Sequence, residues 1–190
     1  MTALYKHISR FVPLTEQDFM GILAHFESIE VGKKQNLVAE GQLCTYNYFV
    51  VKGCLRLFFT DEKGVEQTMQ FALEDWWMTD LDAFVKGQRS HFTIQAIEKT
   101  EVLAIDKKSM DAMLETWPVM EKYFRLIYQR AYAASLFRIK YITRLSKDEF
   151  YDLFINAYPE FAQRIPQKIL ASFLGFTPEY LSELRRKRLS

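Results

Sequence analysis

The sequence has few of the residues from which metal and redox sites are built. It contains only two cysteines, Cys44 and Cys54, which excludes a disulfide framework and a four-cysteine iron–sulfur or zinc site. Its histidines, His7, His25 and His91, are scattered along the chain, whereas a metal-dependent enzyme needs histidines clustered with a carboxylate. It shows no nucleophile–base pair and no glycine-rich phosphate loop. We therefore expect a protein that is not an enzyme and holds no metal.

Long apolar runs are also missing. No stretch approaches the roughly 20 apolar residues that span a bilayer, and residues 1–14 lack the continuous apolar segment of a secretion signal. Together with the unpaired cysteines, this predicts a cytoplasmic protein with no membrane partner. What the chain does have is 49% hydrophobic and 15% aromatic residues among 190, which is enough for a substantial core.

The charge is unevenly distributed. The net charge is only +1, but after residue 162 six cations stand against two carboxylates, Glu179 and Glu183. The C-terminal end is therefore basic and the rest of the chain is mildly acidic, which is typical of a segment that binds a polyanion. The alternative is a solvated helix terminus, where cations are favoured by the helix dipole.

Residues 165–188 read as two short helices joined by a tight turn. Pro166 suits the first helical position, because its fixed φ angle helps and its missing N–H is not needed there. Gly175 follows the last apolar residue of the first helix, where a left-handed residue is often required. Thr177 is the expected N-cap of the second helix, and Pro178 is its first residue.

This stretch resembles the bacterial helix-turn-helix signature. Ala171 falls on the small position of that signature, Gly175 on the turn glycine, and Leu181 and Leu184 on two apolar positions. The resemblance implies two helices that cross steeply and bury their apolar faces on each other. An ordinary helical hairpin within a larger bundle is the alternative.

The first half of the chain predicts a strand-rich fold. A helix at 15–28 begins with a capping box of Thr15 and Asp18. Short β-branched and aromatic runs follow at 48–51, 55–60, 67–71, 93–97 and 101–105, separated by glycine-containing turns. In the run 55–60, Leu55, Leu57 and Phe59 alternate with the residues between them, which indicates one apolar face. Many short strands at this spacing favour a small antiparallel barrel or roll.

A long helix is predicted at 118–145, and it is apolar on two sides. One stripe has heptad spacing with a single polar exception, Arg138; it comprises Met120, Phe124, Ile127, Ala131, Ala134, Arg138, Tyr141 and Leu145. A second stripe is expected to face the roll and comprises Val119, Tyr123, Leu126, Ala133 and Phe137. We expect a dimerisation helix that pairs with a second copy of the chain. An intrachain core helix is the alternative.

A further helix begins at Ser146, which forms a capping box with Glu149. Its apolar side is expected to hold Phe150, Leu153 and Phe154, and Pro159 interrupts it. This helix and the two of the helix-turn-helix make a small three-helix domain. The predicted domains are therefore a roll at 1–117, the dimerisation helix at 118–145 and a helix-turn-helix domain at 146–190, for which the resemblance to the helix-turn-helix signature implies DNA binding.

The segments 40–41, 48–53, 55–59 and 61–64 resemble the cyclic-nucleotide-binding β-roll. Taken with the C-terminal motif, the whole chain resembles the Crp–Fnr family of transcription regulators. The resemblance implies an α+β fold with an N-terminal antiparallel β-roll (a double-stranded β-helix), a long dimerisation helix and a helix-turn-helix domain. Relatives usually continue into a β-hairpin wing; the sequence leaves no room for one, so a smaller DNA contact is expected.

The resemblance also implies a ligand cassette at 75–93. Family members that bind cyclic AMP meet its phosphate with an Arg-Ser pair, which Arg89 and Ser90 match, and guanidinium geometry suits phosphate oxygens. An earlier Gly-Glu pair is replaced by Met78 and Thr79. Cyclic AMP or another small anionic effector is therefore the candidate ligand, with Arg89, Ser90 and Thr79 as its residues. No cofactor is certain.

Three further observations bear on that ligand. Asp80 and Asp82 add negative charge near a supposed anion site, which is unfavourable at close range, so an altered or empty pocket is the alternative. Relatives place a hydroxyl that reaches the adenine at the position of Ser135, although this serine could equally bond back to a carbonyl one turn earlier. Arg89 could equally be a surface arginine on a loop.

On this resemblance the expected function is sequence-specific regulation of transcription. Two recognition helices would enter successive major grooves about 34 Å apart. Thr177, Glu179, Tyr180, Ser182 and Glu183 are the candidates near the start of the helix, and those after Thr177 would face base edges. Lys168, Arg185 and Arg186 would contact phosphates. Double-stranded DNA, a second copy and RNA polymerase are the expected partners; the alternative is a nucleotide-binding module that acts on a protein partner without DNA.

Overall fold

The computed structural model describes residues 2–189, apart from the side chains of Glu160, Ala162 and Leu189. It divides into two compact units. The roll unit comprises the residues up to 59 together with 70–129, and the helical unit comprises 60–69 together with the residues from 130 onward. Each unit is described by itself below. The predicted domain boundaries at 117 and 145 remain predictions.

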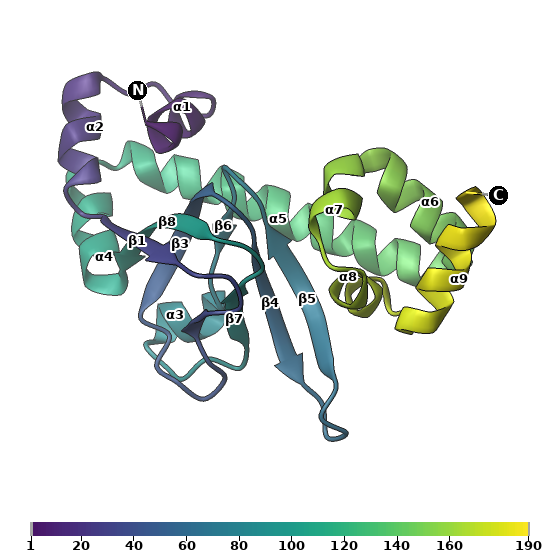
Figure 1. Ribbon diagram of the computed structural model, residues 1–190. Helices are drawn as coiled ribbons and strands as arrows, with labels where there is room; N and C mark the ends of the chain where they lie inside the picture. The colour runs from purple at the N-terminus through teal and green to yellow at the C-terminus, as the bar shows by residue number, and fades with distance from the viewer. Residues whose placement is uncertain (1, 190) are drawn as a thin grey trace. The chain divides into compact units, whose positions relative to one another are not determined.

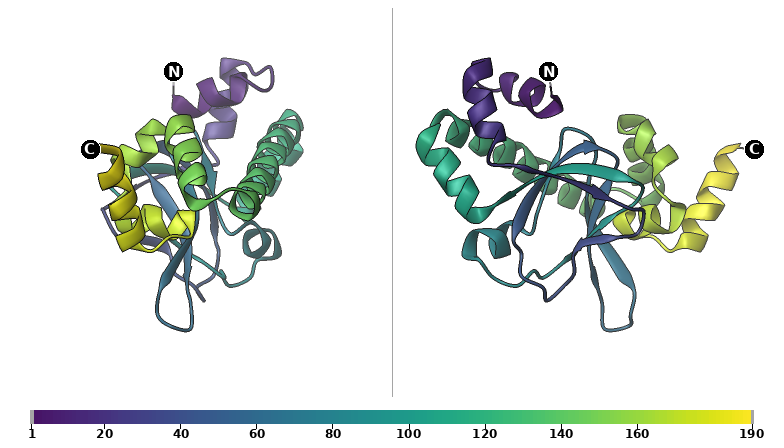
Figure 2. Two further views of the ribbon diagram at one scale, coloured as in Figure 1. Left: turned by 90° about the vertical axis from the view of Figure 1, so that its right-hand side faces the viewer. Right: turned by 60° about the vertical axis from the view of Figure 1, so that its left-hand side comes forward.

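The strands form two four-stranded sheets, as expected for an antiparallel roll (Figures 1 and 2). The first has the order β1-β8-β3-β6, with β1 at Glu27–Val31, β8 at Thr100–Asp106, β3 at Tyr46–Lys52 and β6 at Trp77–Met78. The second has the order β2-β7-β4-β5, with β2 at Asn36–Val38, β7 at Thr93–Ala96, β4 at Leu55–Thr60 and β5 at Glu66–Ala72. Neighbouring strands pair antiparallel in β1–β8, β3–β8 and β3–β6, and in β2–β7 and β4–β7. The predicted α+β class is confirmed.

The turn between β3 and β4 requires its glycine. Gly53 has a φ angle of 102°, and a Cβ atom there would lie 2.8 Å from the carbonyl oxygen of Lys99. A side chain is therefore excluded by both backbone conformation and space. The Lys52-Gly53 turn signal in the sequence is explained by this close approach to the start of β8.

The expected apolar face of β4 is confirmed at Leu55 and Leu57, and the opposite face is buried as well. Leu55 and Leu57 do face the apolar core between the sheets, but Arg56 and Phe58 on the other face are also buried. Arg56 donates from Nε and Nη2 to Gln95 Oε1, at 3.0 and 2.6 Å, and its guanidinium lies over the Phe58 ring. Both faces of β4 can be buried because these partners provide hydrogen bonds and a ring contact for the arginine side chain.

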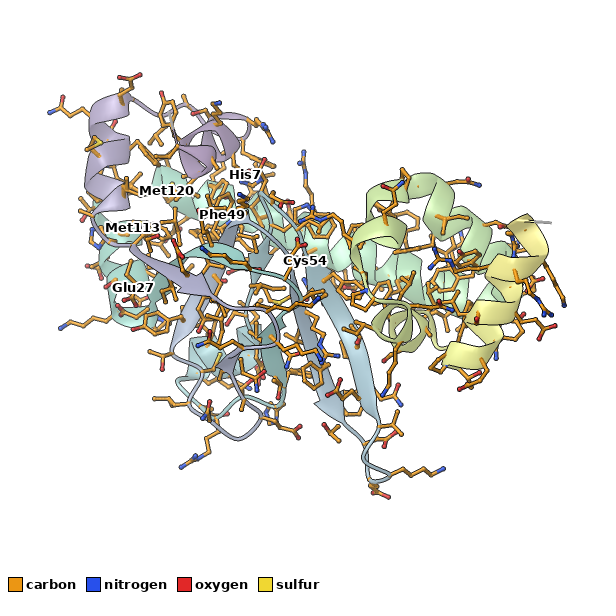
Figure 3. The ribbon with its side chains drawn as sticks, viewed as in Figure 1. His7, Glu27, Phe49, Cys54, Met113 and Met120 are labelled. Carbon is orange, nitrogen blue, oxygen red and sulfur yellow. The ribbon has the colours of Figure 1, made fainter. Side chains whose placement is uncertain are left out.

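A second core lies between the first sheet and the helices that pack on it. These are α1 (Ala3–Ser9), α2 (Glu16–Leu23), α4 (Lys107–Thr116) and the first part of α5 (Val119–Arg144). Phe49, Met113 and Met120 are buried there, and Figure 3 labels them. The sequence did not predict α1 or α4. The cap of α2 is confirmed, since Thr15 Oγ1 accepts from the Asp18 N–H at 3.1 Å; the helix ends at Leu23 rather than 28 because β1 begins at Glu27.

A hydroxyl group ties three elements of this core together. Tyr123 Oη on α5 lies 2.8 Å from His7 Nδ1 on α1 and accepts from Trp77 Nε1 on β6 at 2.7 Å. Burial raises the pKa of Tyr123, so the hydroxyl stays neutral. The predicted stripe facing the roll is thus right at Tyr123 but wrong at Ala133 and Phe137, which are exposed.

The predicted heptad seam is also wrong in its first half. Met120 and Phe124 are buried in the core of the roll unit, so they cannot face a second copy. The physical reason is that the sequence of a helix with two apolar sides does not indicate which side will be buried by its own chain.

The helical unit contains the rest of α5 and four shorter helices, which Figure 2 shows in green to yellow. They are α6 (Lys147–Ala157), α7 (Pro159–Arg164), α8 (Gln167–Leu174) and α9 (Pro178–Leu189). The capping box of Ser146 and Glu149 is confirmed. Three shorter helices were expected, but Pro159 opens α7 as well as ending α6. Leu153 is exposed, and Tyr151 is buried on α6 beside Phe150 and Phe154 instead. Within residues 2–189, no helix is long and apolar enough to cross a membrane.

Candidate nucleic-acid interface and ligand cassette

The turn between α8 and α9 has the predicted chemistry. Gly175 adopts a left-handed φ of 75°, and the Phe176 N–H donates to the Ala171 carbonyl at 2.9 Å. This is the helix-ending bond that a C-terminal glycine permits. Thr177 Oγ1 then accepts from the Tyr180 N–H at 3.2 Å and so caps α9. Pro166 departs from expectation by one position, because it is the N-cap of α8 rather than its first residue.

Ala171, Leu181 and Leu184 are all buried. The two leucines lie one turn apart on α9, and the small side chain of Ala171 on α8 leaves space for close packing. With the tight turn between them, α8 and α9 have the predicted helix-turn-helix form. The opposite side of α9 is therefore left at the surface.

Four of the residues predicted to contact DNA line one shallow hollow of about 440 Å³ on α9. They are Glu179, Ser182, Glu183 and Arg186, all exposed. Thr177 and Lys168 are also exposed, and Arg185 is half-buried. The structure therefore brings most of the predicted reading residues onto one face.

Tyr180 does not belong to that face. Its hydroxyl donates to Asp148 Oδ1 on α6 at 2.5 Å, and its ring packs edge-on against Phe176. The bond to Asp148 raises the pKa of Tyr180. A half-buried aromatic ring packs on its neighbours, so Tyr180 fixes α9 against α6 instead of reaching outward.

The basic end of α9 is partly compensated within the helical unit. Lys187 Nζ pairs with Glu183 Oε1 at 3.1 Å, one turn apart. Arg188 Nη2 pairs with Asp152 Oδ2 on α6 at 2.6 Å. The exposed cations that best suit phosphates are therefore Arg186 and Lys168, with Arg185 beside them.

Sequence reasoning missed the role of Arg138. From α5 its Nη2 donates to the Phe173 carbonyl at 2.7 Å, and its guanidinium lies 4.3 Å from the centre of the Phe173 ring. Burial lowers the pKa of Arg138. A cation at the C-terminal end of α8 is favoured by the helix dipole. The signal was the lone arginine in an apolar stripe, which had been assigned to dimerisation.

Ser172 was missed as well. Its hydroxyl accepts from the Thr68 N–H at 2.8 Å and donates to the Glu66 carbonyl at 2.7 Å. Glu66 and Thr68 open β5, so one side chain on α8 satisfies two backbone groups of the β4–β5 hairpin. No sequence signal distinguishes this serine from an ordinary surface serine.

The predicted ligand cassette runs from β6 through α3 (Leu81–Lys86) to β7. Arg89 is exposed, and its Nη1 donates to the Gly41 carbonyl at 2.7 Å. Ser90 is buried, and its Oγ donates to the Phe92 carbonyl at 2.8 Å and lies 3.3 Å from Asp80 Oδ2. Thr79 Oγ1 donates to the Tyr46 carbonyl at 2.9 Å. The three predicted cassette residues are thus already engaged with protein groups.

Asp80 lies at the centre of the cassette. Its side chain is buried, with the residue only 4% exposed. Oδ1 accepts from the Ala83 N–H at 3.3 Å, and Oδ2 accepts from the His91 N–H at 2.8 Å and lies 3.3 Å from Ser90 Oγ, whose one hydrogen is shared with the Phe92 carbonyl. The sequence analysis treated Asp80 only as an unfavourable charge, because spacing alone does not show that a carboxylate turns inward.

Ser135, the fourth predicted ligand residue, bonds back along its own helix. Its Oγ donates to the Ala131 carbonyl at 3.0 Å. The alternative stated for this serine is therefore what the structure shows, since a helical serine finds an acceptor one turn earlier.

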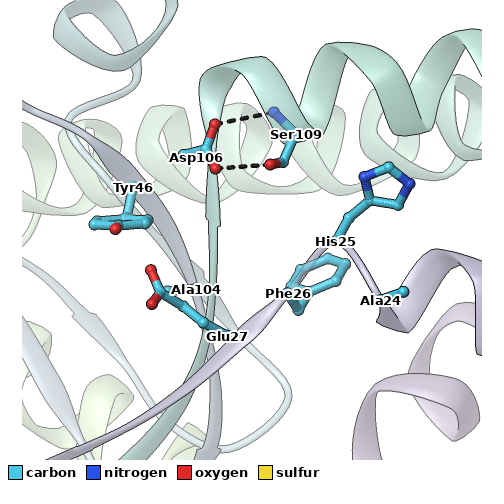
Figure 4. Close-up of a pocket in the computed structure, with 8 residues that line it drawn as sticks. All are labelled: Ala24, His25, Phe26, Glu27, Tyr46, Ala104, Asp106 and Ser109. Carbon is cyan, nitrogen blue, oxygen red and sulfur yellow. Dashed lines mark hydrogen bonds between the residues drawn. The ribbon is translucent and has the colours of Figure 1, made fainter.

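A second pocket, of about 370 Å³, lies in the roll unit (Figure 4). It is lined by Ala24, His25, Phe26, Glu27, Tyr46, Ala104, Asp106 and Ser109. Asp106 accepts from the N–H and the Oγ of Ser109, and these bonds lower its pKa. Two carboxylates with no lysine or arginine among the eight residues disfavour an anionic ligand here. The described residues also include no cluster of three or more side chains suited to a metal ion.

The comparisons with known proteins agree with this architecture. Residues 28–116 match the family described as "Cyclic nucleotide-binding domain". The "cAMP-activated global transcriptional regulator CRP" of Salmonella typhimurium is 24% identical over 106 residues, which cover 56% of this chain and 50% of that protein. The match thus spans about half the length of these curated relatives.

Solved structures extend the likeness of fold. FixK2 from Bradyrhizobium japonicum has a TM-score of 0.74 at 16% identity, over 85% of this chain and 83% of that one. A putative crp/fnr-family regulator from Eubacterium rectale has a TM-score of 0.71 at 17% identity, over 92% and 83%. The matched domain, the curated relatives and this shared fold make the chain similar to regulators of the Crp–Fnr family.

Proposed function

We propose that this chain is a sequence-specific DNA-binding transcription regulator with a cyclic-nucleotide-binding-like sensor roll. The observation that carries the proposal is the helix-turn-helix of α8 and α9, whose outer face exposes Glu179, Ser182, Glu183 and Arg186. Similarity to a curated protein that is named a transcriptional regulator supports it. The same evidence favours a regulator over an enzyme.

The geometry assigns different tasks to the two kinds of side chain. Glu179, Ser182 and Glu183 offer acceptors and a donor that can meet base edges in a major groove. Arg185, Arg186 and Lys168 supply charge for phosphates, which orient the helix without specifying sequence. Tyr180 is removed from the reading set because its hydroxyl is bonded to Asp148.

A second copy of the chain is the proposed partner along α5. Tyr132, Leu136 and Ile139 follow the i, i+4, i+7 spacing of one helical face, and they are 67%, 48% and 58% exposed. Such a run of large apolar side chains is unusual on a surface that stays in water. This face replaces the seam expected from the sequence. Pairing here would present two α9 helices to grooves about 34 Å apart.

The ligand and the remaining partners stay proposals. Cyclic AMP or another small anionic effector is the family's candidate, and the relative named above is described as cAMP-activated. In this chain the cassette diverges, because Thr79 and Ser90 are bonded within the protein. RNA polymerase as a partner and the cytoplasm as location remain predictions.

The proposed function is tested by a gel-shift salt series. Wild type should bind duplex DNA with an affinity that falls steeply as salt rises, because neutralised phosphates release counterions. The double variant Arg185→Ala, Arg186→Ala should bind every sequence more weakly and lower the salt slope by about one per lost contact. The matched control, Lys122→Ala with Arg125→Ala, removes two exposed cations from the part of α5 in the roll unit and should leave the slope unchanged.

Two results would contradict parts of this proposal. A salt slope that is the same in the Arg185, Arg186 variant as in wild type refutes their phosphate role. Absence of DNA affinity at low salt refutes the regulator itself and favours a nucleotide-binding module that acts on a protein partner.

A further inference from the structure

The cassette contains a buried negative charge with no cation bonded to it. Asp80 is 4% exposed, and its carboxylate is held by the Ala83 N–H, the His91 N–H and Ser90 Oγ. Arg89, the nearest predicted anion-binding cation in sequence, donates to the Gly41 carbonyl instead. Removing a carboxylate from water is costly unless hydrogen bonds replace its hydration. The two N–H donors therefore serve this one group, and Ser90 Oγ lies 3.3 Å from it.

Two of these donors lie where the predicted effector would need them. Ser90 belongs to the Arg-Ser pair assigned to a ligand anion, and His91 follows it directly in the chain. Both converge on Asp80 Oδ2, at 3.3 and 2.8 Å. The His91 N–H that is bonded to this oxygen is not available to another acceptor, and the one hydroxyl hydrogen of Ser90 is shared with the Phe92 carbonyl at 2.8 Å.

We infer that the Asp80 carboxylate fills the anion position of the cassette, so that the native roll takes no phosphate-bearing effector there. The inference rests on the proposed assignment of this cassette as the sensor pocket, but not on DNA binding. Asp80 is then the residue that determines ligand specificity: it supplies from within the chain the charge that a cyclic nucleotide would bring. The N–H donors at this position are therefore always occupied by a group of the protein itself.

A phosphate would have to compete with the Asp80 carboxylate for the same donors. A phosphate that entered would have to displace the carboxylate from its bonds to the Ala83 and His91 N–H groups, which are stronger than usual because the acceptor is charged. It would also come close to that carboxylate, and two like charges a few ångströms apart repel strongly where water is excluded. Asp82 takes no part in this competition, because its carboxylate is exposed and pairs with Lys86 at 2.7 Å.

The test is a set of melting curves of the full chain. Wild type, Asp80→Ala and Asp82→Ala are each heated in sodium chloride, in sodium phosphate at equal ionic strength, and with millimolar cyclic AMP. Asp82→Ala is the matched control, because it removes an exposed carboxylate from α3 two residues away. A ligand that binds the native state raises the melting temperature by mass action.

The expected result has two parts. Wild type and Asp82→Ala should show the same rise from chloride to phosphate, because phosphate is excluded from protein surfaces in general, and no rise with cyclic AMP. Asp80→Ala should melt roughly 5 to 10 °C lower in chloride and should regain part of that loss in phosphate, because the freed donors accept an external anion. Should Asp80→Ala fail to fold, Asp80→Asn, which keeps the size and one acceptor oxygen, takes its place.

Stabilisation of wild type by cyclic AMP, or a rise of wild type in phosphate as large as that of Asp80→Ala, would overturn the inference. So would an Asp80 variant that phosphate does not rescue, since its donors would then not form an anion site. These outcomes are independent of the gel shift. If the chain does not bind DNA but phosphate rescues Asp80→Ala, the proposed function is contradicted and this inference stands. If the chain binds DNA but phosphate does not rescue Asp80→Ala, the inference is contradicted and the proposed function stands.

Discussion

The predicted binding surfaces of the two units treat their polar groups in opposite ways. In the roll unit, Thr79, Ser90 and the carboxylate of Asp80 are bonded to one another or to backbone. In the helical unit, Glu179, Ser182 and Arg186 remain exposed around a shallow hollow. The first surface is closed within the chain, and the second is open to a partner.

The difference follows from burial. A polar group removed from water must find its hydrogen-bond partner inside the protein, because an unsatisfied one is costly. An exposed group is satisfied by water and can exchange it for another molecule. A predicted site residue that turns out to be buried therefore tells more about fold than about binding.

The largest expected effect comes from truncating a core side chain, which should destabilise the unit that contains it more than the other unit. Leu181→Ala should destabilise the helical unit by about 2 to 5 kcal/mol, because it leaves a cavity under the buried face of α9. DNA affinity should disappear with it. Ile94→Ala is the matched truncation, since Ile94 is equally buried but lies between the two sheets of the roll. Hydrogen exchange measures the opening of each unit separately.

Leu181→Ala should raise exchange in α6 to α9 and Ile94→Ala in the strands. Equal loss of protection everywhere in both variants would show that the chain unfolds as one cooperative body.

A smaller effect compares one buried hydroxyl with one that is half-buried. Tyr123→Phe should destabilise the protein by about 1 to 3 kcal/mol, because the Trp77 Nε1–H loses its acceptor. Ser172→Ala should cost about 0.5 to 1.5 kcal/mol, because it removes the bonds of a half-buried hydroxyl to the Thr68 N–H and the Glu66 carbonyl. Urea unfolding gives both values.

The control for this pair is Tyr158→Phe, which removes an exposed hydroxyl and should change the free energy of unfolding very little. A larger loss of stability in Ser172→Ala than in Tyr123→Phe would contradict this comparison.

The smallest expected effect is a pH dependence at one helix cap in each unit. Bonds to Ser109 lower the pKa of Asp106 below its ordinary 3.8, and bonds to Ser146 lower the pKa of Glu149 below its ordinary 4.5. A lowered pKa means that the charged form is favoured in the folded state, so each group stabilises fully above its ordinary pKa and loses this contribution as pH falls through the lowered one.

Carbon NMR of the two carboxyl groups should give midpoints below the ordinary values. Asp106→Asn and Glu149→Gln should remove the acid-dependent weakening of α4 and α6 respectively. A midpoint at or above the ordinary value for either group would contradict the assigned bonds.

Local chemistry made much of this fold predictable. The caps at Thr15, Ser146 and Thr177 and the left-handed Gly175 lie where the sequence indicated, because each depends on residues three or four positions apart. The strand at 55–60 was predicted with its observed bounds, and the helix at 118–145 to within one residue. The short strands β1, β2 and β6 carried too little pattern to be found.

The sites were less predictable than the fold. Arg138, Ser172 and Asp80 were misread or missed, and each bonds to a group at least three residues away that only folding brings near. For Arg138 and Ser172 the partners lie 35 and 106 residues distant in the chain. No periodicity within a segment can report such a partner.

By itself, the sequence determined the elements that depend on neighbours along the chain: the helix caps, the tight turn of the helix-turn-helix and the strand-rich half. The tertiary structure alone decided which side of α5 is buried, that Asp80 turns into the cassette and that Tyr180 turns away from the reading face. The reason is burial, since the same residue is a ligand group in water and a structural group in the interior. Its place is set by contacts between distant segments.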